Sequence, residues 1–128
     1  MLKVKELMKR DLTSVQTQET AYAASMLMRV LKIGSVFVKE HDHIVGIVTE
    51  TDLVRKVMSL NRSPESTPVT MIMSSPVICI NQDRPIWDVA DLMEQSNVRH
   101  LAVTDNDEAI IGVISVRDLL HPVAIDDF

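Results

Sequence analysis

The sequence predicts an α+β protein of two repeats, each a three-stranded sheet with two main helices, related by a pseudo-twofold axis. Residues 46–52 and 112–118 share one pattern: a Gly opens a short apolar strand, a hydroxyl residue ends it, and an Asp follows three positions later. A second observation is that the segments around this pattern also correspond in order and type. A third is size, because a unit of about sixty residues cannot cover both faces of its sheet, so two such units are expected to pack together.

The first half of each repeat is predicted as a short helical turn, a strand, a polar turn and an amphipathic helix. The helical turns cover residues 4–8 and 69–73, and the strands cover 12–15 and 77–80. Apolar residues then recur at helical spacing, which predicts the two main helices. They are Ala21, Ala24 and Met28 in the first repeat and Ile86, Val89 and Met93 in the second.

The second half of each repeat is predicted as a hairpin followed by a helix. The expected hairpin strands cover 35–39 with 44–48, and 100–104 with 110–114, around tips rich in Asp and Asn. The closing helices are expected at 51–59 and 116–121. Pro and Ser mark residues 61–68 as a linker, so the predicted organisation is repeat 1 at 1–60, linker at 61–68 and repeat 2 at 69–128.

Composition limits the function. A net charge of −5 argues against a sequence-independent grip on nucleic acid, which requires a basic surface. A single cysteine, Cys79, fits a reducing compartment and is expected to be a buried strand residue. The charged N-terminus does not resemble a signal peptide, and no apolar run approaches the ~20 residues that span a bilayer. We therefore expect a cytoplasmic protein without a membrane partner.

These features resemble the CBS domain, named for cystathionine β-synthase, of which a tandem pair is called a Bateman module. The resemblance rests on the twin Gly-to-Asp segments, on residues 71–77 and on residues 97–101, and it covers residues 4–122. It implies a stand-alone regulatory protein in signal transduction, with no required cofactor. The implied ligands are AMP, ADP, ATP, S-adenosylmethionine or a dinucleotide, held in two clefts between the repeats.

In the family, the Asp contacts ribose hydroxyls and the Ser or Thr lies near phosphate. The resemblance therefore implies two sets of nucleotide-binding residues. One cleft would combine Ser115 and Asp118 with Asp11, Thr13, Ile33 and Gly34, with charge from Arg117. The other would combine Thr49 and Asp52 with Pro76, Ile78, Val98 and Arg99, with His100 next along.

A Ser/Thr-x-x-Asp sequence also suits a helix N-terminus, where the hydroxyl and the carboxylate cap the helix. Capping and ligand binding are compatible, because helix N-termini attract anions and an Asp can accept hydrogen bonds from a vicinal diol. Arg99 can hold phosphate and Gly34 cannot, so the Asp52 cleft is expected to prefer a phosphate-bearing ligand. The alternative for Arg99 and Arg117 is a solvated surface charge.

Two further features have alternative interpretations. His41 and His43 could suggest a metal, but a polar turn is favoured because two histidines do not complete a site. Trp87 lies off the apolar stripe of its helix. It is either an anchor for a partner surface or a cover for the edge of its own core.

The sequence favours a regulatory adenine-nucleotide sensor over an enzyme. It contains no activated nucleophile set, metal quartet or P-loop. The rival hypothesis is an interaction module without a functional ligand site. A homodimer joined through the helices is the assembly that the resemblance implies, together with an unidentified regulated protein.

Overall fold

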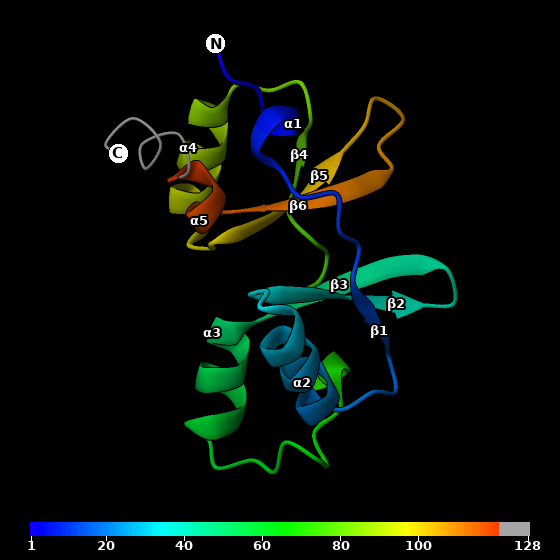
Figure 1. Cartoon of the computed structure of the whole chain (residues 1–128). Coiled ribbons are helices and arrows are strands. Elements are labelled where there is room, and N and C mark those ends of the chain that lie inside the picture. Colours follow the sequence, from blue (N-terminus) through cyan, green and yellow to red (C-terminus); the bar gives the residue numbers. More distant parts are fainter. Residues whose placement is uncertain (121–128) are drawn as a thin grey trace. The chain divides into compact units, whose positions relative to one another are not determined.

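The chain forms two three-stranded sheets, as the sequence predicts (Figure 1). The structure is a computed structural model that describes residues 1–120. Its contacts divide the chain into two units. Residues 13–77 form one, here called the Asp52 unit, and residues 1–12 with residues 78–120 form the other, the Asp118 unit.

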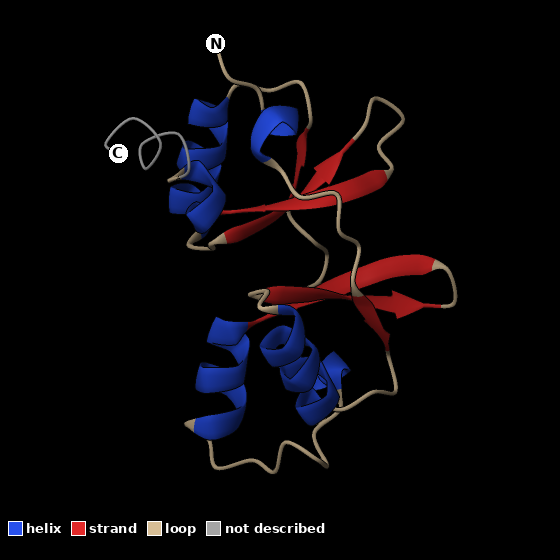
Figure 2. Ribbon diagram, in the orientation of Figure 1, coloured by secondary structure: helices blue, strands red, loops and turns tan. Residues whose placement is uncertain are grey.

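In the Asp52 unit, the first strand runs parallel to the second, which pairs antiparallel with the third. Helices α2 and α3 lie together on one side of this sheet (Figure 2). The elements are β1 (Ser14–Gln16), α2 (Ala21–Leu31), β2 (Ser35–Glu40), β3 (His43–Thr49), α3 (Glu50–Leu53), the π-helix η1 (Val54–Met58) and the 3₁₀ helix η2 (Val69–Met71).

The Asp118 unit repeats this topology, with a parallel pair followed by an antiparallel hairpin. Its elements are α1 (Val4–Leu7), β4 (Cys79–Asn81), α4 (Ile86–Ser96), β5 (His100–Thr104), β6 (Ile110–Ser115) and α5 (Val116–Leu119). The predicted end of the last helix, at His121, lies outside the described residues. The helix predicted over 51–59 begins one residue earlier, because Thr49 caps it, and it changes to π-helical pairing at Val54.

Aliphatic side chains form one core in each unit. In the Asp52 unit the core combines residues of the strands, α2, η1 and η2. It comprises Val15, Ala21, Ala24, Met28, Val36, Val38, Val48, Val57, Val69 and Ile72. The core of the Asp118 unit comprises Val4, Ile80, Val89, Met93, Leu101, Val103 and Ile114.

The first short helix of each repeat belongs to the unit that contains the sheet of the other repeat. Helix α1 lies in the Asp118 unit, where the Val4 amide donates to the Arg84 carbonyl at 2.9 Å. Helix η2 lies in the Asp52 unit, where the Val69 amide donates to the Glu19 carbonyl at 2.9 Å. Each repeat, 1–60 or 69–128, therefore contributes its first segment to the unit that holds the sheet of the other repeat. These two segments, which contain α1 and η2, are called the exchanged segments.

The segment expected to be a linker, residues 61–68, is attached to the Asp52 unit. The amides of Ala21 and Tyr22, at the start of α2, donate to the carbonyls of Thr67 and Pro64 at 2.8 and 3.0 Å. Thr67 is buried, and its hydroxyl donates to the Ser63 carbonyl at 2.7 Å. These bonds satisfy backbone donors that a helix N-terminus leaves unpaired.

The glycines that open the repeated segments allow the exchanged segments to approach the hairpins. Lys9 and Val113 exchange two backbone hydrogen bonds, and Ser74 and Ile47 do the same in the other unit. An added Cβ on Gly112 would lie 2.4 Å from the Lys9 carbonyl oxygen. On Gly46 it would lie 2.5 Å from the Met73 sulfur and 3.1 Å from the Ser74 carbonyl oxygen.

We expect Gly112→Ala to lower the free energy of unfolding by about 2 kcal/mol, because its methyl group would collide with backbone. Gly46→Ala should cost less, because the flexible Met73 side chain can move. Urea denaturation of both variants and the wild type measures the difference. An equal or larger loss in Gly46→Ala would contradict this explanation of the glycines.

Candidate functional site

The candidate site centres on two turns of the same design, one at the end of each hairpin. The Asp52 turn comprises residues 49–52, and the Asp118 turn comprises residues 115–118. In the Asp52 turn, the Thr49 amide donates to Asp52 Oδ2 at 2.9 Å, and the Asp52 amide donates to Thr49 Oγ1 at 3.3 Å. Thr49 Oγ1 and Asp52 Oδ2 are also 3.2 Å apart.

The Asp118 turn reproduces these contacts. The Ser115 amide donates to Asp118 Oδ2 at 2.8 Å, the Asp118 amide lies 3.4 Å from Ser115 Oγ, and Ser115 Oγ lies 3.2 Å from Asp118 Oδ2. Thr49 and Ser115 both adopt extended backbone, with φ of −119° in each case, which is typical of an N-cap residue. Both turns are therefore complete capping boxes, and the capping interpretation is confirmed.

A cation contacts the second carboxylate oxygen of each turn. Lys56 Nζ lies 2.9 Å from Asp52 Oδ1, and Lys9 Nζ lies 3.7 Å from Asp118 Oδ1. The two carboxylates are nearly buried, with 8% and 10% of their side-chain surface exposed. Buried carboxylates require such partners, because an isolated charge is costly to remove from water.

Sequence reasoning missed both lysines. Lys56 was detectable in principle, because it lies four residues after Asp52, and that spacing brings side chains together on a helix. Lys9 is far from Asp118 in the sequence, and the pairing of Lys9 with Val113 brings it to the turn. No local pattern indicates that contact.

Gly34 and Arg99 occupy equivalent places beside the two turns. The Glu50 amide donates to the Gly34 carbonyl at 3.1 Å, and the Val116 amide donates to the Arg99 carbonyl at 3.0 Å. Arg99 thus lies next to the Asp118 turn within its own unit, and Gly34 lies next to the Asp52 turn. The assignment of Arg99 to the cleft of Asp52, and of Gly34 to that of Asp118, remains a prediction.

The other predicted site residues lie close to these positions in the chain. Thr13 and Ile78 extend the sheets by one residue, since their carbonyls accept from the amides of Phe37 and Ala102 at 2.9 and 3.0 Å. His100 lies opposite Ser115 in the hairpin register. The exposed residues of the set are Asp11, Pro76, Ile78, Arg99 and Arg117, and the partly buried ones are Thr13, Ile33, Gly34, Val98 and His100.

The metal alternative has no support among residues 1–120, which contain no group of three or more His, Cys, Asp or Glu side chains suited to a metal ion. His41 lies in the hairpin turn with a φ of 56°, a conformation common in turns. Within the same described range, no helix is long and apolar enough to cross a bilayer.

Cys79 is exposed, contrary to the expectation of a buried strand residue. It lies in β4, but the next residue, Ile80, occupies the core-facing position, and successive strand side chains point to opposite faces. Neighbouring atoms still shield the thiol partly from water, and this desolvation raises its pKa. The thiol is therefore protonated at neutral pH and is a poor nucleophile.

Comparison with known proteins identifies the family. The CBS domain model matches residues 4–59 and again residues 69–124. The chain therefore belongs to the CBS-domain family and carries a tandem pair of these domains, a Bateman module.

Two similar proteins illustrate this membership. A protein of Methanopyrus kandleri is 36% identical over 119 residues, which cover 92% of this chain and 61% of that protein. This chain thus spans about three fifths of that relative's length. The solved structure of a CBS-domain protein from Burkholderia ambifaria has a TM-score of 0.91 at 33% identity, covering 99% of this chain and 97% of that chain.

Two solved structures with bound ligands share the fold at lower identity. A CBS domain pair in complex with 5′-methylthioadenosine and S-adenosyl-L-methionine has a TM-score of 0.85 at 21% identity, over 98% of each chain. A CBS domain protein from Pyrobaculum aerophilum complexed with AMP has a TM-score of 0.83 at 24% identity, over 98% of this chain and 97% of that one. At these identities the likeness shows the fold alone.

Because both turns cap helices, Thr49→Ala and Ser115→Ala should each lower the free energy of unfolding by about 1 kcal/mol without any ligand. Asp52→Ala should cost more than Asp118→Ala, since Asp52 also holds Lys56 at the shorter distance. Thermal melting in ligand-free buffer measures these differences. Unchanged melting of both Asp variants would show that the carboxylates do not stabilise the helices.

Proposed function

We propose that the chain is a regulatory module that binds an adenosine-containing ligand at its Ser/Thr-x-x-Asp turns. The observation that carries the proposal is the repeated, nearly buried carboxylate, which accepts from the amide and the hydroxyl of the first residue of its own turn and faces a lysine. The two ligand-bound neighbours support an adenosyl compound as the ligand class.

The turns suit a ribose diol for a chemical reason. A carboxylate has about four acceptor positions, and the capping contacts occupy mainly Oδ2 in both turns. Oδ1 remains the oxygen that can accept from ribose hydroxyls. Phosphate would be bound by nearby cations. The candidates are Arg117, within the Asp118 turn, and Arg99, which the sequence assigns to the cleft of Asp52.

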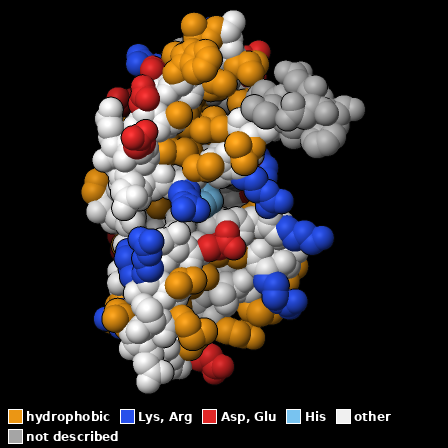
Figure 3. Space-filling model, turned by 90° about the vertical axis from the view of Figure 1, so that its left-hand side faces the viewer, with side chains coloured by type: hydrophobic (Ala, Val, Ile, Leu, Met, Phe, Trp, Pro, Cys, Tyr) orange, Lys and Arg blue, Asp and Glu red, His pale blue; other side chains and the backbone are white. Residues whose placement is uncertain are grey.

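Ligand binding would regulate association with a partner if the ligand has different affinities for two arrangements of the helices. Each turn starts a helix. A ligand bound at the turn would therefore stabilise the helix position with the higher ligand affinity, and this would favour one form of the surface that the helix presents. We expect that surface to support a homodimer or a regulated partner. Figure 3 shows hydrophobic side chains exposed on one face of the molecule among charged ones.

Exposed apolar side chains also favour a second candidate function, an interaction module that needs no ligand. Trp87 is 63% exposed, so most of its indole faces solvent and does not cover the core of its unit. Val54, Met58 and Leu120 are exposed as well. The capping boxes are complete without a ligand, which is compatible with this alternative.

A thermal-shift panel distinguishes the two candidates. We expect one or more of AMP, ADP, ATP, NAD and S-adenosylmethionine to stabilise the protein by about 2.7 kcal/mol when its free concentration is 100 times the Kd. The matched compound 2′,3′-dideoxyadenosine, which lacks the ribose diol, should stabilise much less than adenosine.

The variants Asp52→Ala and Asp118→Ala locate the effect. Loss of the ligand-induced shift in either variant, with the fold intact, supports binding at that turn. No shift with any adenine compound at millimolar concentration would eliminate the sensor and leave the interaction module. Equal shifts with adenosine and its dideoxy analogue would contradict the role of the diol.

A further inference from the structure

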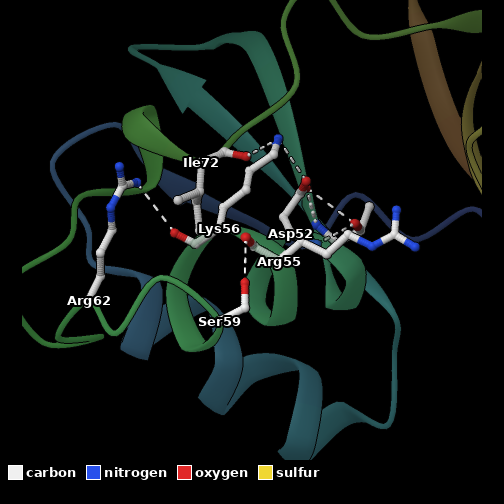
Figure 4. A network of polar contacts seen from close by, with 7 residues as sticks. Asp52, Arg55, Lys56, Ser59, Arg62 and Ile72 are labelled. Carbon is white, nitrogen blue, oxygen red and sulfur yellow. Dashed lines mark hydrogen bonds and ion pairs between the residues drawn. The ribbon is translucent and has the colours of Figure 1, made fainter.

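Lys56 holds two acceptors at once. Its Nζ lies 2.9 Å from Asp52 Oδ1 and donates to the Ile72 carbonyl at 3.0 Å. Figure 4 shows the ammonium group between these two oxygens. The lysine therefore joins the helical segment that follows the Asp52 turn to the segment that follows η2.

This contact reduces the acceptor capacity of Asp52. Oδ2 already faces the Thr49 amide and hydroxyl, and Oδ1 faces Lys56. One acceptor position on Oδ1 remains, whereas a vicinal diol offers two O–H donors. A diol at this turn must therefore compete with Lys56 for the carboxylate.

The hydrogen bond to Ile72 also stabilises the position of Lys56. The residue that supplies its second acceptor, Ile72, is completely buried, and its carbonyl would lose a hydrogen bond if the lysine left. An unmet buried backbone acceptor is unfavourable. The Arg62 guanidinium adds to the local order, because it donates to the Lys56 carbonyl at 3.3 Å.

The Asp118 turn is different in this one respect. Its Oδ2 has the same capping contacts, but Lys9 Nζ is 3.7 Å from Oδ1, beyond hydrogen-bond range. The Lys9 side chain is also more exposed than that of Lys56, 55% against 41%. Oδ1 of Asp118 is thus more available to a diol than Oδ1 of Asp52.

We propose that Lys56 is a positioning residue that closes the Asp52 turn, so that a ribose diol occupies the Asp118 turn first. This inference rests on the proposed function and deepens it, since it assigns an order to the two turns. This order, in which the diol binds first at Asp118, differs from the preference expected from the sequence. That preference was based on Arg99 and Gly34, concerned phosphate, and favoured the cleft of Asp52. A ligand that displaces Lys56 also removes its hydrogen bond to Ile72, and this links occupancy of the Asp52 turn to the exchanged segment.

Adenosine titrations in single-turn backgrounds test the order. Adenosine is the probe because it has the diol and no phosphate, so the charge of Lys56 cannot attract it electrostatically as it would a nucleotide. In the Asp118→Ala background, which leaves the Asp52 turn, adding Lys56→Met should tighten adenosine binding about fivefold or more, because the competing donor is gone. Lys56→Arg keeps the charge and should give no such gain.

The matched control is Lys9→Met in the Asp52→Ala background, which leaves the Asp118 turn. Because Lys9 makes no hydrogen bond to Asp118 at 3.7 Å, this change should alter adenosine affinity by less than about twofold. An Asp118→Ala, Lys56→Met protein that is folded by circular dichroism yet binds adenosine no more tightly than Asp118→Ala overturns the inference. So does an equal gain from Lys9→Met.

Amide hydrogen exchange tests the contact without any ligand. Lys56→Met should speed exchange at Met73 and Ser74, which follow Ile72. It should leave exchange unchanged at Lys9, which pairs with Val113 in the other unit as Ser74 pairs with Ile47. Unchanged exchange at Met73 and Ser74 overturns the link to the exchanged segment. If no protein, wild type included, binds adenosine or the nucleotides of the panel, the proposed function fails and the exchange result alone decides the role of Lys56.

Discussion

Two nearly buried carboxylates constrain the rest of this structure. Asp52 and Asp118 are almost sealed from water, and a charge in that position must be satisfied by fixed partners. Each turn supplies two of these partners, the backbone amide and the hydroxyl of its first residue, and these contacts also begin the next helix. The same atoms therefore stabilise the fold and, under the proposed function, present Oδ1 for recognition, so that capping and ligand binding would be two uses of one arrangement.

The exchanged segments connect each turn to the start of the other repeat in the sequence. In the Asp118 unit, the segment after α1 supplies Lys9 directly to Asp118. In the Asp52 unit, the segment after η2 supplies the Ile72 carbonyl, and Lys56 bridges it to Asp52. Both segments come close because Gly46 and Gly112 have no side chain. The turn is thus joined to the exchanged segment by a direct lysine contact in the Asp118 unit and by a bridging lysine in the Asp52 unit. This difference leaves the two carboxylates with different capacity to accept further hydrogen bonds.

Local patterns in the sequence were sufficient to predict most of the fold. Helical and alternating periodicity indicate α2, α4 and the hairpins, and the Ser/Thr-x-x-Asp spacing indicates both caps, because these depend on neighbours in the chain. The exchange of the first segments and the contact of Lys9 with Asp118 depend on pairings between distant residues, which no local pattern specifies. Alternation also cannot decide which of Cys79 and Ile80 faces the core, since a short strand leaves its register open.

The two turns are the proposed ligand site. Backbone amide chemical shifts, followed by NMR while adenosine is titrated into the wild-type protein, test it most directly, because the Thr49 and Ser115 amides both donate to the carboxylates. We expect saturable shifts at Ser115 and Asp118 first, and at Thr49 and Asp52 only at higher concentration. Saturable shifts elsewhere in the protein, with all four of these amides unmoved, would contradict the account.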